Sequence, residues 1–194
     1  ELEEEDMADF QRLAAFLAQG NYPGLTVTDE IYAGEGHGAE GIALTGQAMI
    51  FEGLVRFSAE FSVILCRAQD GATVFWDSAE NVHEHGILAR STVPASPAAQ
   101  AQVGEARALA QKVADALDYV GVAAFEFFAT EDGPVFNEMA PRVHNSGHWT
   151  IEGALTSQFE NHIRAICDLP LGDTRLAARE VEMRNIVGDA AEDW

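Results

Sequence analysis

Residues 122–139 have the pattern of a β-hairpin, with two strand-like runs on either side of an acidic turn at Asp132. In an antiparallel pair centred on that turn, Glu126 and Glu138 lie opposite each other, with side-chain bases about 5 Å apart. Phe125 points to the other face, into the core, because side chains alternate along a strand. The pattern therefore predicts an antiparallel sheet in which one hairpin face is apolar and the other carries two facing carboxylates.

Two carboxylates directly opposite each other are destabilising unless something compensates their charge. A divalent cation would do so, and magnesium is typically held by one or two carboxylates together with substrate phosphates and water. Asn137, next to Glu138, offers a further oxygen. The alternative is an exposed hairpin at the edge of the sheet, with both glutamates pointing at water. The hairpin thus predicts either a Mg²⁺ site at Glu126 and Glu138 or an acidic edge.

A loop dense in hydrogen-bond donors follows the hairpin directly, at residues 142–149. Its Asn-Ser-Gly sequence is turn chemistry, so His144 and His148 are not expected on one helix. This argues against zinc, for which a cysteine or third histidine nearby is also missing. Arginine, imidazole and backbone N–H groups suit an anionic substrate such as a phosphate or a carboxylate. The alternative is a loop whose side chains satisfy only one another.

The other elements mix strands with helices. We expect strands at 25–28, 48–55, 60–68, 72–76 and 181–187, and helices at 9–19, 97–119 and 151–169. The helix at 97–119 begins with a Ser-Pro cap, and Gly121 follows its end. Residues 77–95 read as a long polar connection, of a length that is usually functional. This order favours an α+β fold over a regular parallel α/β sheet.

Charge and cysteine content exclude several classes of protein. The 194 residues include 32 acidic and 11 basic ones, giving a formal net charge of −21. A surface this negative repels nucleic acid and anionic membranes, and no run of 18 apolar residues is present to span a bilayer. Cys66 and Cys167 lie in apolar surroundings, typical of free core thiols in a cytoplasmic protein. We therefore expect neither a nucleic-acid nor a membrane partner.

Several stretches resemble the 5-(carboxyamino)imidazole ribonucleotide synthases, a family of ATP-grasp ligases of purine biosynthesis. The similarity runs from about Met49 to the end of the chain, and the run at 142–149 distinguishes this family from other ATP-grasp proteins. The matching stretches are Glu52–Val55, Glu60–Val63, Glu80–Leu88, Phe125–Phe128, Val135–Thr150, Thr156–His162 and Asp168–Gly172.

The resemblance implies an ATP-grasp fold, an antiparallel sheet with flanking helices, with the metal and substrate sites in residues 48–178. It implies ATP- and bicarbonate-dependent carboxylation of 5-aminoimidazole ribonucleotide, with carboxyphosphate as the intermediate and ATP and Mg²⁺ as cofactors. Such phosphoryl transfer needs positioning and charge neutralisation more than covalent help from the protein. Family members are commonly dimeric, so the resemblance also implies a homodimer.

The same resemblance assigns roles to individual residues. Glu52, Gly53, Leu54 and Val55 line the adenine pocket, and Glu60 holds the ribose hydroxyls. His83 lies near the nucleotide and, with Arg142, is a candidate catalytic residue. Glu126 and Glu138 bind Mg²⁺, with Asn137 beside them at the nucleotide. The residues facing bicarbonate and the ribonucleotide are Arg142, His144, Asn145, Ser146 and His148.

The chain also departs from the family. We expect the family's N-terminal nucleotide-fold domain to be missing and its small C-terminal β domain to be truncated, with residues 179–194 as its start. Residues 1–47 resemble a divergent remnant of the lid subdomain, since Thr26 or Thr28 and Glu35 stand where the family has phosphate-binding cations. The alternative function is therefore a truncated or degenerate module without turnover, which retains at most metal or phosphometabolite binding.

Overall fold

A computed structural model of the protein describes residues 55–188. The chain divides into two units between Arg56 and Phe57, and every described helix and strand belongs to the second unit. The helix expected at 9–19, the strand at 25–28, most of the strand at 48–55 and the lid remnant lie outside the described residues. So do the adenine-pocket candidates Glu52, Gly53 and Leu54.

One antiparallel sheet forms the centre of the fold, in the order β6-β5-β1-β3-β4-β7, with β2 paired to one end of β1. Its strands are β1 (Ala59–Arg67), β2 (Thr73–Phe75), β3 (Ala79–Glu84), β4 (Ile87–Val93), β5 (Gly121–Thr130), β6 (Gly133–Ala140) and β7 (Val181–Arg184). The α+β expectation is confirmed, and the strands expected at 60–68, 72–76 and 181–187 form with small changes in their bounds.

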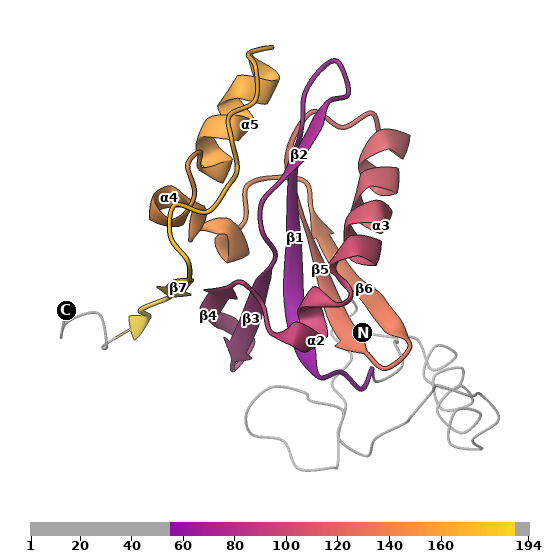
Figure 1. Ribbon diagram of the computed structural model, residues 1–194, viewed down its shortest axis with the longest axis vertical. Helices are drawn as coiled ribbons and strands as arrows, with labels where there is room; N and C mark the ends of the chain where they lie inside the picture. Colours follow the sequence, from indigo (N-terminus) through magenta and orange to yellow (C-terminus); the bar gives the residue numbers. More distant parts are fainter. Residues whose placement is uncertain (1–54, 189–194) are drawn as a thin grey trace, which may run out of the picture. The chain divides into compact units, whose positions relative to one another are not determined.

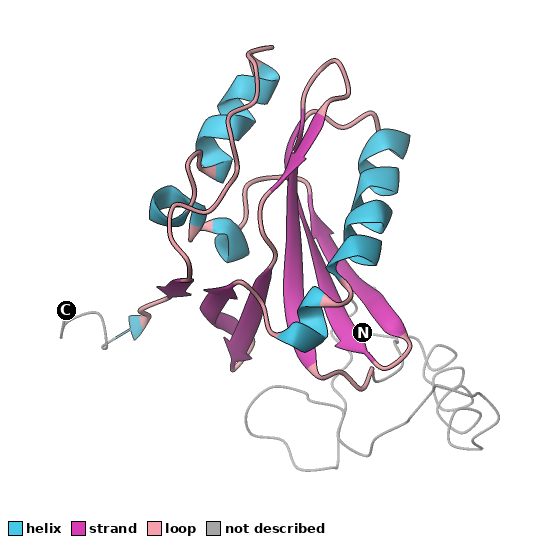
Figure 2. Cartoon of the chain, viewed as in Figure 1, coloured by secondary structure: helices cyan, strands magenta, loops and turns pink. Residues whose placement is uncertain are grey.

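Helices cover both faces of the sheet (Figure 1). On one face lie α2 (Pro97–Gln100) and α3 (Val103–Ala116); on the other lie the 3-10 turn η1 (Asn145–Gly147), α4 (Thr150–Gly153) and α5 (Gln158–Ile166). Figure 2 shows this three-layer arrangement of helices and strands. Because both faces are covered, the central strands β1 and β5 are buried along most of their length, which explains their almost continuous apolar sequences.

The two faces of the sheet bury different cores. Toward α3, the rings of Phe61, Phe125 and Phe127 pack against alanines of the helix such as Ala106 and Ala110, whose small side chains let helix and sheet approach closely. Toward α4 and α5, the second core is built from larger and more varied side chains, among them Ile64, Cys66, Trp76, Val122, Trp149 and Ala165. Side chains at alternate positions of β5 therefore face different layers.

The long polar connection expected at 77–95 is wrong, because these residues form the β3–β4 hairpin. Its turn is His85-Gly86, and both residues have positive φ, at 52° and 77°; this geometry matches the right-handed twist of the flanking strands. The inward positions of the hairpin include Asn81 and Ser91, which are buried and hydrogen-bonded to each other at 2.8 Å. A strand is recognised in a sequence by alternating apolar residues. Because polar residues occupy buried positions here, that alternation is absent and the segment resembles a loop.

The helix expected at 97–119 is interrupted and shorter. It breaks at Gln102, whose side-chain amide donates to the Thr130 carbonyl at 2.8 Å. After α3 it is Asp118, with φ of 46°, that takes the left-handed position, whereas Gly121 begins β5. Gly121 itself has φ of 118°, and a Cβ there would lie 2.9 Å from the His162 ring, so both the backbone conformation and the close packing require glycine. Helical spacing predicts one buried face that includes Ala106, Leu109 and Ala110, but only the two alanines are buried and Leu109 is partly exposed.

The helix expected at 151–169 is two helices. The extended residue Ala154 separates them, and Thr156 in this break accepts a hydrogen bond from the Trp76 indole at 2.8 Å. Ser157 then caps α5 by accepting from the Glu160 N–H, an N-terminal signal that lay inside the expected helix.

The two cysteines differ in their surroundings. Cys66 is buried, and burial raises the pKa of its thiol to about 12, whereas Cys167 is exposed; both are free. The expectation of two core thiols is therefore right for Cys66 only. Separately, none of the helices between residues 55 and 188 combines the length and apolar character needed to cross a membrane.

Candidate functional site

A β-bulge creates the carboxylate pair on the β5–β6 hairpin. Near the turn Thr130 pairs with Gly133, a register that would place Glu126 opposite Asn137. The register shifts between Glu126 and Phe127, so that Glu126 instead faces Glu138. The pairing predicted from the sequence is confirmed, although the turn is centred half a residue earlier than expected and the bulge makes up the difference.

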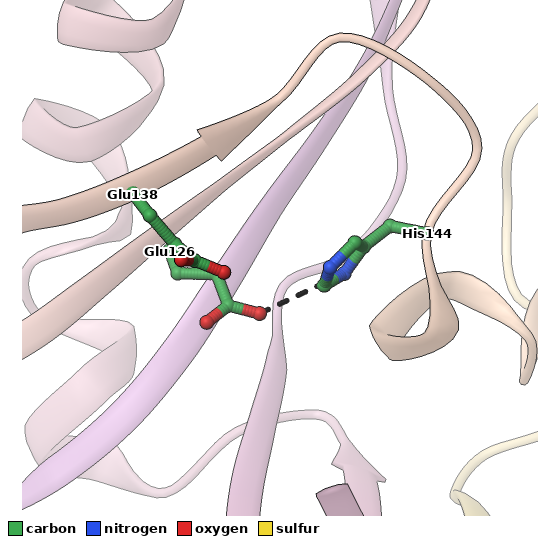
Figure 3. A group of neighbouring side chains, drawn as sticks. All are labelled: Glu126, Glu138 and His144. Atoms are coloured by element: carbon green, nitrogen blue, oxygen red, sulfur yellow. Dashed lines mark ion pairs between the residues drawn. The ribbon is translucent and has the colours of Figure 1, made fainter. Parts of the chain in front are cut away.

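Glu126, Glu138 and His144 come together on the face of the sheet that carries α4 and α5 (Figure 3). One potential ligand atom of each lies within 4.8 Å of those of the other two. The Glu126 side chain is 13% exposed and that of His144 is 9% exposed, and Nδ1 of His144 lies 3.6 Å from Oε1 of Glu126. Glu138 is exposed, so the group is open to solvent on one side.

The charges in this group are poorly compensated by the described residues. Burial raises the pKa of Glu126, the neighbouring charge of Glu138 raises it further, and His83 acts in the opposite direction. Burial lowers the pKa of His144, and the guanidinium of Arg142 adds to this, while Glu138 opposes it. Two oxygen ligands beside a neutral imidazole are a donor set that fits a divalent cation.

A second pair lies one step along the same face. Glu60 of β1 and His83 of β3 approach to 2.6 Å between Oε2 and Nδ1, and each side chain is about one-quarter exposed. A bulge between Val82 and His83 places the imidazole beside the carboxylate. Glu60 is two residues from Ser62, which pairs with Glu126 across β1 and β5, so the two pairs lie on the same face of neighbouring strands.

The loop after β6 is ordered by its own side chains. His144 is extended and caps η1, and its Nδ1 lies 2.9 Å from the Ser146 hydroxyl. The Asn145 side chain accepts from the Ser146 N–H at 2.9 Å. Arg142 is exposed, and His148 stacks on the Phe159 ring. The turn expected from Asn-Ser-Gly is confirmed as a single 3-10 turn.

The structure thus brings most of the predicted site residues to one end of the sheet. Glu60, His83, Glu126, Glu138 and His144 share the α4–α5 face. Asn137 lies exposed at the bulge, and Val55 lies in an irregular segment ahead of β1.

Sequence reasoning missed the buried polar residues that support this site. Asn81 donates to the Ser62 hydroxyl and accepts from Ser91, and Ser62 pairs with Glu126 across β1 and β5. Gln158 holds the backbone of His144. The His-Gly turn predicts the β3–β4 hairpin, which carries Asn81 and Ser91. The Ser157 cap signal marks Gln158 as the first residue of a helix.

Comparison with known proteins places this geometry in context. The family model for the ATP-grasp domain matches residues 33–159. The N5-carboxyaminoimidazole ribonucleotide synthase of Vibrio parahaemolyticus is 51% identical over 152 residues, which are 78% of this chain and 39% of that protein. The enzyme of the same name from Escherichia coli is 43% identical over 149 residues, 77% of this chain and 41% of that protein.

Solved structures agree with these relatives. The crystal structure of N5-carboxyaminoimidazole ribonucleotide synthetase from Thermus thermophilus superposes with a TM-score of 0.68 at 51% identity, over 71% of this chain and 38% of that one. The synthase from Aspergillus clavatus, in complex with ADP and 5-aminoimidazole ribonucleotide, gives 0.64 at 37% identity over 69% and 36%. The chain spans about two-fifths of the length of the curated relatives it matches.

Proposed function

Because this chain belongs to the ATP-grasp family, we propose that it is the central catalytic part of an N5-carboxyaminoimidazole ribonucleotide synthase. The reaction would be the ATP- and bicarbonate-dependent carboxylation of 5-aminoimidazole ribonucleotide, through carboxyphosphate. The observation that carries the proposal is the convergence of Glu126 and Glu138 with His144 of the loop at 142–149. Relatives about 50% identical over three-quarters of the chain support it.

The nucleotide end of the site is assigned to the pairs on β1, β3 and β5. We propose that Glu60, fixed by His83 at 2.6 Å, accepts hydrogen bonds from the ribose hydroxyls, and that His83 stands between nucleotide and reaction centre. Glu126 and Glu138 hold Mg²⁺, which supplies charge neutralisation for the phosphates when it is bound. Asn137 at the bulge lies beside Glu138, in place to contact the nucleotide.

The substrate end is assigned to the loop after β6. The exposed guanidinium of Arg142 is a bidentate donor suited to bicarbonate or phosphate. Burial and Arg142 lower the pKa of His144, which favours the neutral imidazole, a group that can both accept and donate a hydrogen bond at this end. Asn145, Ser146 and His148 complete the substrate loop. We propose that Glu52, Gly53, Leu54 and Val55 line the adenine pocket.

Substrate-stimulated ATP hydrolysis tests this function. With Mg²⁺, bicarbonate and 5-aminoimidazole ribonucleotide, we expect the chain to release phosphate from ATP, and Glu138→Ala to lower that rate at least about 100-fold, because a developing phosphate charge loses its counter-ion. Phosphate release is measured with and without the ribonucleotide. Glu131→Ala, an exposed glutamate in the turn of the same hairpin, is the matched control and should retain the wild-type rate.

Two outcomes would contradict the proposal. If calorimetry detects no Mg·ATP binding by the wild-type chain, the chain is a module without turnover. If hydrolysis occurs but is unaffected by Glu138→Ala, the carboxylate pair is not the metal site.

We also propose that the chain pairs with a second copy of itself through the outer face of α4 and α5. Six apolar side chains of α4, α5 and the residues flanking α5 are each 39–54% exposed: Ile151, Leu155, Phe159, Ile163, Ile166 and Leu169. Such a group of exposed apolar side chains on a chain of net charge −21 is typical of a protein interface, and a self-complementary apolar surface suits a two-fold dimer.

Sedimentation equilibrium tests the dimer. The wild type is expected at twice the mass of the chain, and Ile163→Glu at the monomer mass, because a charge placed in an apolar interface is left without a partner. Ile87→Glu, similarly exposed but in the β3–β4 hairpin, should leave the dimer intact. A monomeric wild type would refute the proposal.

The cytoplasm is the proposed location. Both cysteines are free thiols, as is usual in a reducing compartment.

A further inference from the structure

The side-chain amide of Gln158 binds both backbone hydrogen-bonding groups of His144, as a neighbouring β-strand would. Gln158 is fully buried at the start of α5, and its Oε1 accepts from the His144 N–H at 3.0 Å while its Nε2 donates to the His144 carbonyl at 2.6 Å. His144 is extended, with φ of −134° and ψ of 152°. Both of its backbone hydrogen-bonding groups therefore bind one amide, from 14 residues further along the chain, and the carbonyl also accepts from the Gly147 N–H at 3.0 Å.

The same residue also fixes the far end of the turn. The backbone N–H of Gln158 donates to the Thr150 hydroxyl at 3.0 Å, and this hydroxyl donates to the Gly147 carbonyl at 2.7 Å. A Cβ on Gly147 would stand 2.5 Å from Oε1 of Gln158 and 2.6 Å from the Ile64 side chain. Gln158 therefore holds η1 at both of its ends, with no space left between the amide and the turn.

This clamp acts on the imidazole that faces the carboxylate pair. The His144 ring lies 2.9 Å from the hydroxyl of Ser146, in the same turn, and 3.6 Å from Glu126. A shift of the turn backbone would therefore move the ring relative to Glu126. We propose that Gln158 is a positioning residue, which sets the place of the His144 ring against Glu126 and Glu138 and thereby the cation affinity of this group. This inference rests on the proposed function, since the cation site is part of it.

The chemistry of the clamp requires an amide of this length. Methionine has a similar length and volume but neither donor nor acceptor, so the His144 N–H would lose its partner and the His144 carbonyl would keep only the Gly147 N–H. An ionised glutamate would direct an anionic oxygen at the His144 carbonyl. Asparagine keeps the amide but is one methylene shorter, so it cannot make both hydrogen bonds without moving the loop.

Mn²⁺ binding to Gln158→Met tests the inference. Bound and free Mn²⁺ are distinguished by electron paramagnetic resonance, and the ring signals of His144 and His83 are followed by NMR, where broadening by Mn²⁺ falls steeply with distance. We expect the variant to bind Mn²⁺ about 10-fold or more weakly, the range seen when a residue that orients a ligand is removed. The broadening of the His144 signal should decrease relative to that of His83.

Asn161→Leu provides a matched control on the same helix. Asn161 is also fully buried, and its amide accepts from the Gly172 N–H at 2.7 Å and donates to the Gly172 carbonyl at 3.2 Å. The control loses the same kind of clamp on a loop away from the carboxylate pair. We expect it to lose stability without a change in Mn²⁺ affinity beyond about twofold, since it leaves the residues that orient His144 in place.

The outcomes separate the inference from the proposed function. No Mn²⁺ binding by the wild type would refute the cation site and the inference together. Wild-type binding with unchanged affinity and unchanged His144 broadening in Gln158→Met would refute the inference alone, as would an equal loss in Asn161→Leu. If Gln158→Met does not fold, Gln158→Asn is measured against the same control, with the same criteria.

Discussion

Replacing Glu126 with glutamine is expected to make the metal-free protein more stable and to weaken its binding of Mn²⁺ at least about 100-fold. The stability gain, up to about 1 kcal/mol, comes from removing one of two like charges that face each other across β5 and β6. The affinity loss comes from removing a ligand, since even an orienting partner of a ligand is worth about 10–100-fold. Urea unfolding without metal and Mn²⁺ titration measure the two effects.

The charge argument for Glu126 also predicts the direction in which stability changes with pH. The pKa of Glu126 is raised in the folded protein by burial and by Glu138, so the folded chain retains this proton to higher pH than the unfolded chain does. Wild-type stability should therefore fall as pH rises from the ordinary value of 4.5 through the raised folded pKa. Glu126→Gln should lack that part of the fall.

Glu131→Gln is the control for this prediction, because Glu131 is exposed in the turn of the same hairpin. It should behave as the wild type in both measurements. A metal-free Glu126→Gln protein that is less stable than the wild type would show that Glu126 is needed for folding, contrary to the charge argument.

Replacing Phe125 with alanine is expected to lower the free energy of unfolding by about 3–5 kcal/mol, the range for a large buried aromatic side chain. Phe125 is fully buried in the core between β5 and α3. The loss is a large fraction of the roughly 5–15 kcal/mol that stabilises a typical domain, so unfolding is best followed in urea at low temperature. The folded fraction should bind Mn²⁺ as the wild type does, because the side chain points away from Glu126.

Phe136→Ala gives the comparison for Phe125. Phe136 is 50% exposed at the edge of the same hairpin, and its removal should cost less than about 1 kcal/mol, since much of its surface is already in water. Similar losses in both variants would mean that the core on the α3 side does not carry the stability assigned to it.

The sequence predicted best where one charged residue interrupts an apolar strand. On β5, Glu126 within an apolar run, together with the turn at Asp132, was enough to predict the hairpin and its carboxylate pair. The prediction succeeded although the bulge at Asn137 was not foreseen. The predicted turn centre was half a residue too late, and the bulge shifted the strand register by the same amount. The two errors cancelled in the pairing of Glu126 with Glu138.

Two of the failures have one physical cause, which is polar side chains whose hydrogen bonds are satisfied in the interior. Asn81 and Ser91 look like loop residues until their hydrogen bonds to each other are known. Gln158 looked like part of a long helix because nothing in the pattern shows that an amide binds a backbone 14 residues away. On α3 the cause is different: Ala106 and Ala110 are buried and Leu109 is partly exposed, because close approach to the phenylalanine rings favours the smaller side chain.

The alternation of the central strands separates two kinds of mutation. Phe125 and Glu126 are consecutive, yet one belongs to the packing against α3 and the other to the chemistry beside α5. Substitutions at Phe125 and Phe127 are therefore limited by the volume of the core on the α3 side. A substitution at Glu126 is limited by the charge that the carboxylate pair needs. The core between the sheet and α3 could therefore be repacked to raise thermal stability, and the residues on the α4–α5 face of the sheet would stay unchanged.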